Sequence, residues 1–121
     1  MKNLFLLLSV LAPVISCKNK DENAEKTAST QKPTELGKEI FEGKGNCSAC
    51  HLPNQKVIGP SIQDISKIYK AKNANIIDFL VNDAEPIIDP SQYEVMKTNF
   101  VITKAMSDQE LKAIEAYIYS Y

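Results

Sequence analysis

Residues 47–51 read Cys47-Ser48-Ala49-Cys50-His51, a Cys-x-x-Cys-His arrangement. This spacing is typical of covalent haem attachment. Two thiols at this separation reach the two vinyl groups on one edge of a porphyrin, while the adjacent imidazole turns under the ring to bind the iron. We therefore predict that Cys47 and Cys50 form thioethers to one haem c and that His51 is its proximal iron ligand.

Three other kinds of site use cysteines at this spacing, and each fits the sequence less well. A thioredoxin-like redox pair lies beside a strand–helix unit, but no β-rich segment is near residues 47–51. A structural zinc site needs four ligands, whereas two cysteines and the single histidine of the chain are available around this centre. A disulfide between Cys47 and Cys50 would leave His51 without a role.

Beyond this motif, residues 34–121 resemble the small class I c-type cytochromes, which are soluble electron carriers with one haem. Gly37 and Phe41 precede the haem motif as they do in the first helix of that family, and Gly59-Pro60 follows it. Ser-Asp-Gln-Glu-Leu then opens a final helix that ends in Ala-Tyr-Ile. The resemblance implies an all-α, cytochrome c-like fold of about four helices around one covalently bound haem.

The same resemblance implies two contacts. The carbonyl of Pro60 would accept the proton on the His51 nitrogen that does not bind iron, which raises the basicity of the ligand. The first and last helices would cross at Gly37, with Phe41 close to Tyr117.

Two methionines of the expected mature chain are candidates for the second axial ligand. Met106 directly precedes Ser107, the expected N-cap of the last helix, and Leu111 lies one turn further, so a hydrophobic staple explains Met106 as packing. Met96 lies in a proline-bounded loop where the family places its ligand, and we predict that it is the distal iron ligand. The family often has proline after this methionine, whereas Lys97 follows it here.

Apolar residues at helical spacing predict the secondary structure. Thr34 is the expected N-cap of the first helix, and Gly43 and Gly45 are expected to end it and turn the chain into the haem motif. Ser107 and Glu110 predict a capping box at the start of the last helix. The expected helices cover residues 34–42, 62–70, 74–81 and a last segment from Ser107.

The N-terminal residues predict export and anchoring. Residues 1–16 have the positive start, apolar run and small-residue end of a secretory signal peptide, and Val-Ile-Ser-Cys resembles the lipobox of bacterial lipoproteins. We predict cleavage before Cys17 and lipidation of Cys17, which would anchor the protein on the periplasmic side of a bacterial membrane, inner or outer. Residues 17–33 are polar and predicted to be a disordered tether, and residues 34–121 form the predicted cytochrome c domain.

Length and charge limit the remaining possibilities. The 121 residues allow one domain, and a net charge of −1 gives no electrostatic footprint for nucleic acid. No apolar run reaches the roughly 20 residues that a membrane-spanning helix needs. Residues 34–121 are near the size at which one hydrophobic core is only marginally stable. We therefore expect a buried porphyrin to complete the core and the haem-free domain to fold poorly.

The resemblance implies a one-electron carrier rather than an enzyme, and we expect a monomer. Its partners would be redox proteins, such as a quinol-oxidising complex as donor and a terminal oxidase or reductase as acceptor. Two alternatives stay open: a haem sensor or small haem enzyme with an open distal site, and a fixed electron-entry subunit of a larger complex. Lys44, Lys56, Lys97 and Lys104 are candidates for a positive ring around the haem edge, although scattered solvated lysines fit the same positions.

Overall fold

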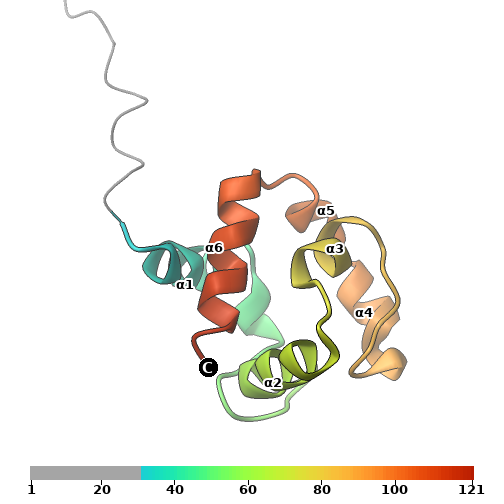
Figure 1. Ribbon diagram of the computed structural model, residues 1–121. Coiled ribbons are helices and arrows are strands. Elements are labelled where there is room, and N and C mark those ends of the chain that lie inside the picture. The colour runs from blue at the N-terminus through green and yellow to red at the C-terminus, as the bar shows by residue number, and fades with distance from the viewer. Residues whose placement is uncertain (1–30) are drawn as a thin grey trace, which may run out of the picture.

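The computed structural model describes residues 31–121, so the expectations for the signal peptide, Cys17 and most of the tether lie outside the described residues. In this range the fold is all-α, and its β-type pairing is limited to an isolated bridge between His51 and Lys56 (Figure 1). No helix of residues 31–121 is long and apolar enough to cross a membrane. The helices are α1 (Pro33–Glu42), α2 (Ile62–Lys72), α3 (Ile76–Val81), α4 (Tyr93–Lys97), α5 (Phe100–Thr103) and α6 (Asp108–Ile118), and two 3₁₀ turns are η1 (Cys47–Ala49) and η2 (Pro90–Gln92).

The four helices expected from the sequence are present, with some of their ends shifted. The prediction that Thr34 caps the first helix is wrong, because α1 begins at Pro33 and Lys32 occupies the N-cap position. Proline suits the first helical position because its missing N–H would have no partner there. α2 continues two residues past its expected end, to Lys72, and α3 begins two residues late because the side chain of Asn75 caps it.

The turn between α1 and η1 also differs from the expectation. Gly43 ends α1 as predicted, and its N–H donates to the carbonyl of Glu39 at 2.9 Å. The left-handed residue of the turn, however, is Asn46, with φ of 52°, and the glycines of residues 31–121 all have negative φ. Asparagine adopts this conformation more readily than other residues with a side chain.

α1 and α6 cross each other at one side of the molecule (Figure 1). Gly37 lies at the crossing, where a Cβ atom would be 1.9 Å from the backbone oxygen of Ala113. Phe41 packs edge-on against Tyr117, with 5.3 Å between the ring centroids. Both contacts are those that the family resemblance implied, and they fix α1, which leads into the haem motif, against the last helix.

The predicted capping box at the start of α6 is confirmed. The Ser107 hydroxyl accepts from the backbone N–H of Glu110 at 3.4 Å, and the Glu110 carboxylate accepts from the backbone N–H of Ser107 at 2.9 Å. These two bonds satisfy backbone donors that a helix start otherwise leaves unpaired.

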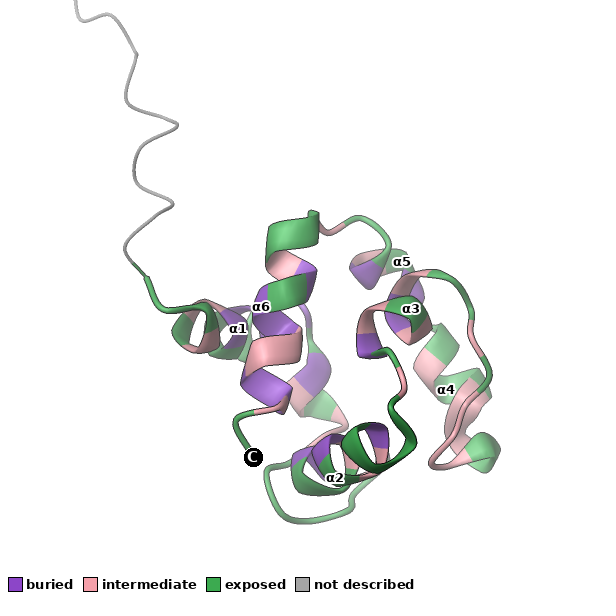
Figure 2. Cartoon of the chain, in the orientation of Figure 1, coloured by how far each residue is buried: buried purple, intermediate pink, exposed green. Residues whose placement is uncertain are grey.

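The buried faces of the helices turn inward around a shared interior (Figure 2). Because α4 and α5 have only five and four residues, no helical periodicity in the sequence indicated them. These two short helices nonetheless close one side of the interior, where Phe100 of α5 is buried. The buried apolar core consists mainly of Ile40, Phe41, Ile62, Tyr69, Ile76, Leu80, Leu111, Ile114 and Ile118.

Candidate haem site

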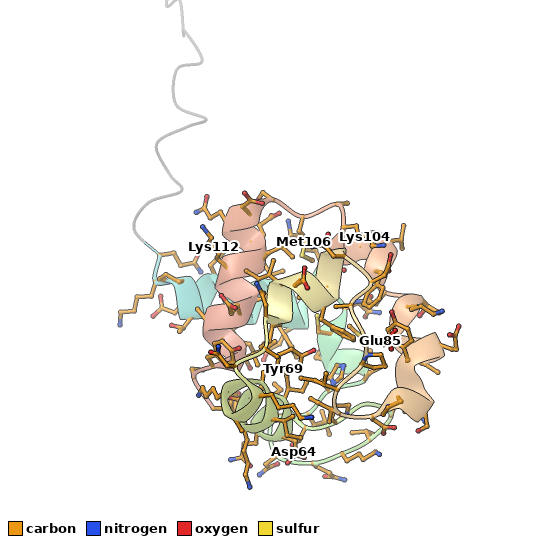
Figure 3. All side chains as sticks on the ribbon, turned by 45° about the vertical axis from the view of Figure 1, so that its right-hand side comes forward. Asp64, Tyr69, Glu85, Lys104, Met106 and Lys112 are labelled. Atoms are coloured by element: carbon orange, nitrogen blue, oxygen red, sulfur yellow. The ribbon has the colours of Figure 1, made fainter. Side chains whose placement is uncertain are left out.

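A large cavity occupies the middle of the fold. Its empty volume is about 1110 Å³, which includes the open solvent at its mouth. Its walls are mostly apolar and come from α1, α2, α3 and α6; Figure 3 shows Tyr69 of α2 near the middle of the molecule. Cys47, Cys50, His51 and Met96 all line this one cavity.

The two cysteines lie on one wall of the cavity, at η1. The carbonyl of Cys47 accepts from the backbone N–H groups of Cys50 at 3.1 Å and His51 at 3.0 Å, which makes this a tight turn. Both thiols are free. Burial, followed by the charge of Cys50, raises the pKa of the Cys47 thiol to about 11. Cys47 is thus a neutral thiol, unlike the low-pKa cysteine of a thioredoxin-like redox pair.

The ring of His51 is held from behind by Pro60. Its Nδ1 lies 2.8 Å from the Pro60 carbonyl oxygen, which can only accept, so Nδ1 carries the proton and Nε2 keeps a free lone pair. Burial lowers the pKa of His51 below its usual value, and the bond to Pro60 opposes this only in part. His51 is therefore a neutral imidazole with one nitrogen available, the form that binds a metal ion.

Gly59 makes room for this ring. A Cβ atom at position 59 would lie 2.4 Å from Cε1 of His51 and 2.7 Å from its Nδ1, far inside van der Waals contact. From the sequence, Gly59 was expected only as part of a Gly-Pro motif and not as a site residue. A glycine next to the proline that binds His51 was the signal available.

The two methionines have different surroundings. Met96 lies on α4 rather than in the loop that the sequence predicted, is half-buried, and lines the cavity. Met106 is half-buried against the hydrophobic core, near the start of α6 (Figure 3), and is not among the residues that line the cavity. Of the two sulfurs, Met96 is the one whose residue borders the same space as His51.

These residues fit a covalently bound haem. Two free thiols and a neutral imidazole with a free nitrogen occupy one wall of an apolar cavity, and a thioether lies on the same cavity. A family model described as cytochrome c matches residues 34–121, which is most of the chain. The chain belongs to the cytochrome c family. No curated protein matches it.

Membership of this family establishes the cofactor and the general activity. The cytochrome carries haem c, attached covalently, and is an electron-transfer protein that works with redox partners. It is a class I c-type cytochrome, and the all-α fold predicted from the sequence is confirmed.

The four lysines considered for a positive docking ring are all paired with carboxylates in the cytochrome. Lys97, Lys104 and Lys56 each lie 2.6 Å from a carboxylate oxygen, and Lys44 contacts the carboxylate of Glu110. Their positive charges are therefore compensated locally, and they form no ring of free cations. The carboxylate partner of Lys97 is Glu94, that of Lys104 is Asp83, and that of Lys56 is Asp89.

Proposed function

We propose that this cytochrome is a one-electron carrier whose haem iron is bound by His51 and Met96. The observation that carries the proposal is that Met96 lines the same cavity as His51 and the two cysteines. Ligation by histidine and methionine raises the reduction potential of a haem iron. With both residues bound, the iron would have no position left for a substrate.

The residues of the chain support electron transfer because they fix the orientation of His51 and keep water away from the apolar walls of the site. Pro60 fixes the orientation and tautomer of His51, and α4 supplies Met96 from a different part of the sequence. The apolar walls exclude water, which limits the rearrangement of surrounding dipoles when the charge of the site changes. The cavity is partly open to solvent, which leaves an edge through which a partner can exchange electrons.

The physiological setting is also part of the proposal, and it rests on the sequence. A lipid on Cys17 would hold the cytochrome on the periplasmic side of a bacterial membrane, and the polar residues 17–33 would let the domain reach several partners. We propose a respiratory role between a quinol-oxidising complex and a terminal oxidase or reductase. Cys17→Ala should move the protein from the membrane fraction to the soluble fraction, and its retention in the membrane would contradict the anchor.

A redox titration of the haem-loaded protein tests the electron-carrier proposal. We expect a reversible one-electron transition and a reduced form that does not bind carbon monoxide, because Met96 occupies the iron. A reduced form that binds carbon monoxide readily, or turnover of peroxide by the oxidised protein, would instead support a sensor or a small haem enzyme with an open distal site.

A further inference from the structure

Two segments that are far apart in the sequence both line the cavity. The proximal segment, residues 43–61, contains both cysteines and His51, and the distal segment, residues 83–99, contains Met96. The two segments share no helix or strand. Contacts that cross directly from one segment to the other therefore help to set the position of Met96 relative to His51.

Two polar contacts make this crossing. Lys56 Nζ of the proximal segment lies 2.6 Å from Asp89 Oδ2 of the distal segment. The side-chain amide of Asn99 donates to the carbonyl of Gly45 at 3.0 Å, in the turn before the haem motif. Asp89 and Asn99 both line the cavity, so the two contacts lie at its border.

The proximal end of the ion pair is fixed relative to His51. Lys56 forms the isolated antiparallel bridge with His51. The loop that contains Lys56 is closed by a hydrogen bond from the backbone N–H of Gly59 to the carbonyl of Cys50 at 3.0 Å. The backbone at Lys56 thus moves with the backbone of the proximal ligand.

The distal end is fixed as well. The side chain of Asp89 is only 15% exposed, and its second carboxylate oxygen accepts from the Ser91 hydroxyl at 2.5 Å. Asp89 directly precedes η2, which continues without a break into α4 and Met96. A carboxylate that is already held by Ser91 loses little conformational freedom when it pairs with Lys56.

The other lysine pairs near the site do not make this connection. Lys97 and Glu94 lie on the same short helix, and Lys104 joins Asp83 on the distal side of the cavity. Lys44 joins the turn after α1 to α6. Of the four pairs, the one between Lys56 and Asp89 alone links the proximal segment to the distal segment.

We propose that Lys56 and Asp89 form a clasp that holds the distal segment across the cavity and so keeps Met96 in place. Both are positioning residues, because they act on Met96 through the segment that carries it. The inference rests on the proposed ligation by Met96. Opening of the clasp would let the distal segment move away from the proximal segment and give external ligands access to the site.

The rate at which cyanide binds the oxidised, haem-loaded protein tests the clasp, since cyanide can bind only after Met96 has left the iron. We expect Asp89→Asn and Lys56→Gln each to raise this rate about two- to fivefold, the range for a partly exposed ion pair. The double variant should be no faster than either single variant. Added salt should raise the rate of the unaltered protein and have little effect on the variants.

Asp83→Asn is the matched control, because Asp83 forms an ion pair of the same length with Lys104 that does not cross the cavity. Its cyanide rate should equal that of the unaltered protein. Equal rates in the Asp89 and Asp83 variants would overturn the clasp, whether both are raised or both are unchanged. The far-red absorption band of methionine bound to ferric iron separates the two proposals: if the unaltered protein lacks it, ligation by Met96 fails and the clasp with it, whereas a present band with unchanged rates overturns the clasp alone.

Discussion

Gly59 and Pro60 fix the orientation of the His51 ring, one by leaving space and the other by accepting its proton. The ring cannot rotate freely between them, because its Nδ1 is bonded on one side and the backbone of Gly59 lies against its edge. The orientation of His51, the proposed proximal ligand, is therefore set by backbone atoms of two adjacent residues.

Gly59→Ala tests this arrangement. The added methyl group would meet Cε1 of His51 at 2.4 Å, so the ring or the loop must shift, and we expect a loss of about 1–3 kcal/mol in the free energy of unfolding. The absorption spectrum should change as well, because the imidazole would be displaced. Asn54→Ala in the same exposed loop is the control and should alter neither quantity; a Gly59→Ala protein with the original stability and spectrum would contradict the argument.

Single residues differ in how far the sequence alone could place them. Cys47, Cys50 and His51 lie within one short stretch of sequence, so their spacing predicted a common site before any tertiary contact was known. Met96 required a choice between two methionines, and the helical turn on which it lies could not be predicted, because five residues carry no periodic signal. The ion pair between Lys56 and Asp89 could not be predicted from the sequence, because it joins two loops that only the folded chain brings together.

At the scale of elements, the crossing of α1 and α6 holds the N-terminal part of the domain to its C-terminal part. The carbonyl of Ala113 occupies the place where a side chain on residue 37 would begin. The Phe41–Tyr117 ring contact lies one turn further along α1. Close packing of this kind transmits small changes in volume as shifts of whole helices.

Gly37→Ala is expected to separate the two helices. A methyl group 1.9 Å from the Ala113 oxygen cannot be accommodated unless the backbone moves. We therefore expect a loss of at least about 2 kcal/mol in the free energy of unfolding. Denaturant unfolding of the haem-loaded protein measures this. Lys38→Ala, at the next and exposed position of α1, should change the stability by less than about 0.5 kcal/mol; similar losses in both variants would argue against a specific crossing contact.

The ionised carboxylate of Glu110, at the start of α6, should make the stability of the protein depend on pH in the acid range. The ion pair with Lys44, followed by the bond from the Ser107 backbone, holds the pKa of Glu110 below its usual value of 4.5. A carboxylate with a lowered pKa in the folded state contributes stability above its unfolded pKa and loses that contribution as the pH falls through its folded pKa. Glu110→Gln should therefore lower Tm at neutral pH slightly and flatten its decline in acid.

Lys44→Gln should reproduce part of this effect, because it removes the first cause of the lowered pKa and keeps the capping box. Thermal melts over the acid range check both variants. A decline of Tm with the same slope in the Glu110→Gln variant as in the unaltered protein would show that Glu110 is not a source of the acid sensitivity.

At the scale of the whole molecule, the apolar core and the haem cavity are parts of one interior. Phe41, Tyr69, Ile114 and Ile118 belong to the buried core and also line the cavity. These side chains would line an empty cavity if no cofactor filled it. A small domain cannot offset so large a loss of apolar contacts.

We therefore expect the haem-free chain, obtained by replacing Cys47 and Cys50 with Ala, to lose its cooperative fold. Circular dichroism should show reduced helix content and no sharp thermal transition. Met106 packs against the core and does not line the cavity. The haem-loaded Met106→Ala protein is therefore the control, and it should retain the fold with a loss of about 2 kcal/mol in the free energy of unfolding. A sharp, cooperative melt of the haem-free protein would show that its core is sufficient without the cofactor.

The overall architecture was predictable because local and global signals agree for the main helices. The capping box of α6, the apolar spacing of α2 and the glycine at the crossing each indicate the same all-α fold. What the sequence did not reveal is the closure of the cavity on the distal side. That closure depends on short turns and on ion pairs between loops, whose geometry is set only when the chain is folded.

Absorption spectra of the oxidised, haem-loaded protein and of its two methionine variants test directly whether Met96 binds the iron. We expect a low-spin c-type spectrum with the weak far-red band of methionine bound to ferric iron. This band should be lost in Met96→Ala and retained in Met106→Ala. A high-spin spectrum in the unaltered protein, or a band that Met106→Ala abolishes and Met96→Ala leaves intact, would show that Met96 does not complete the haem site.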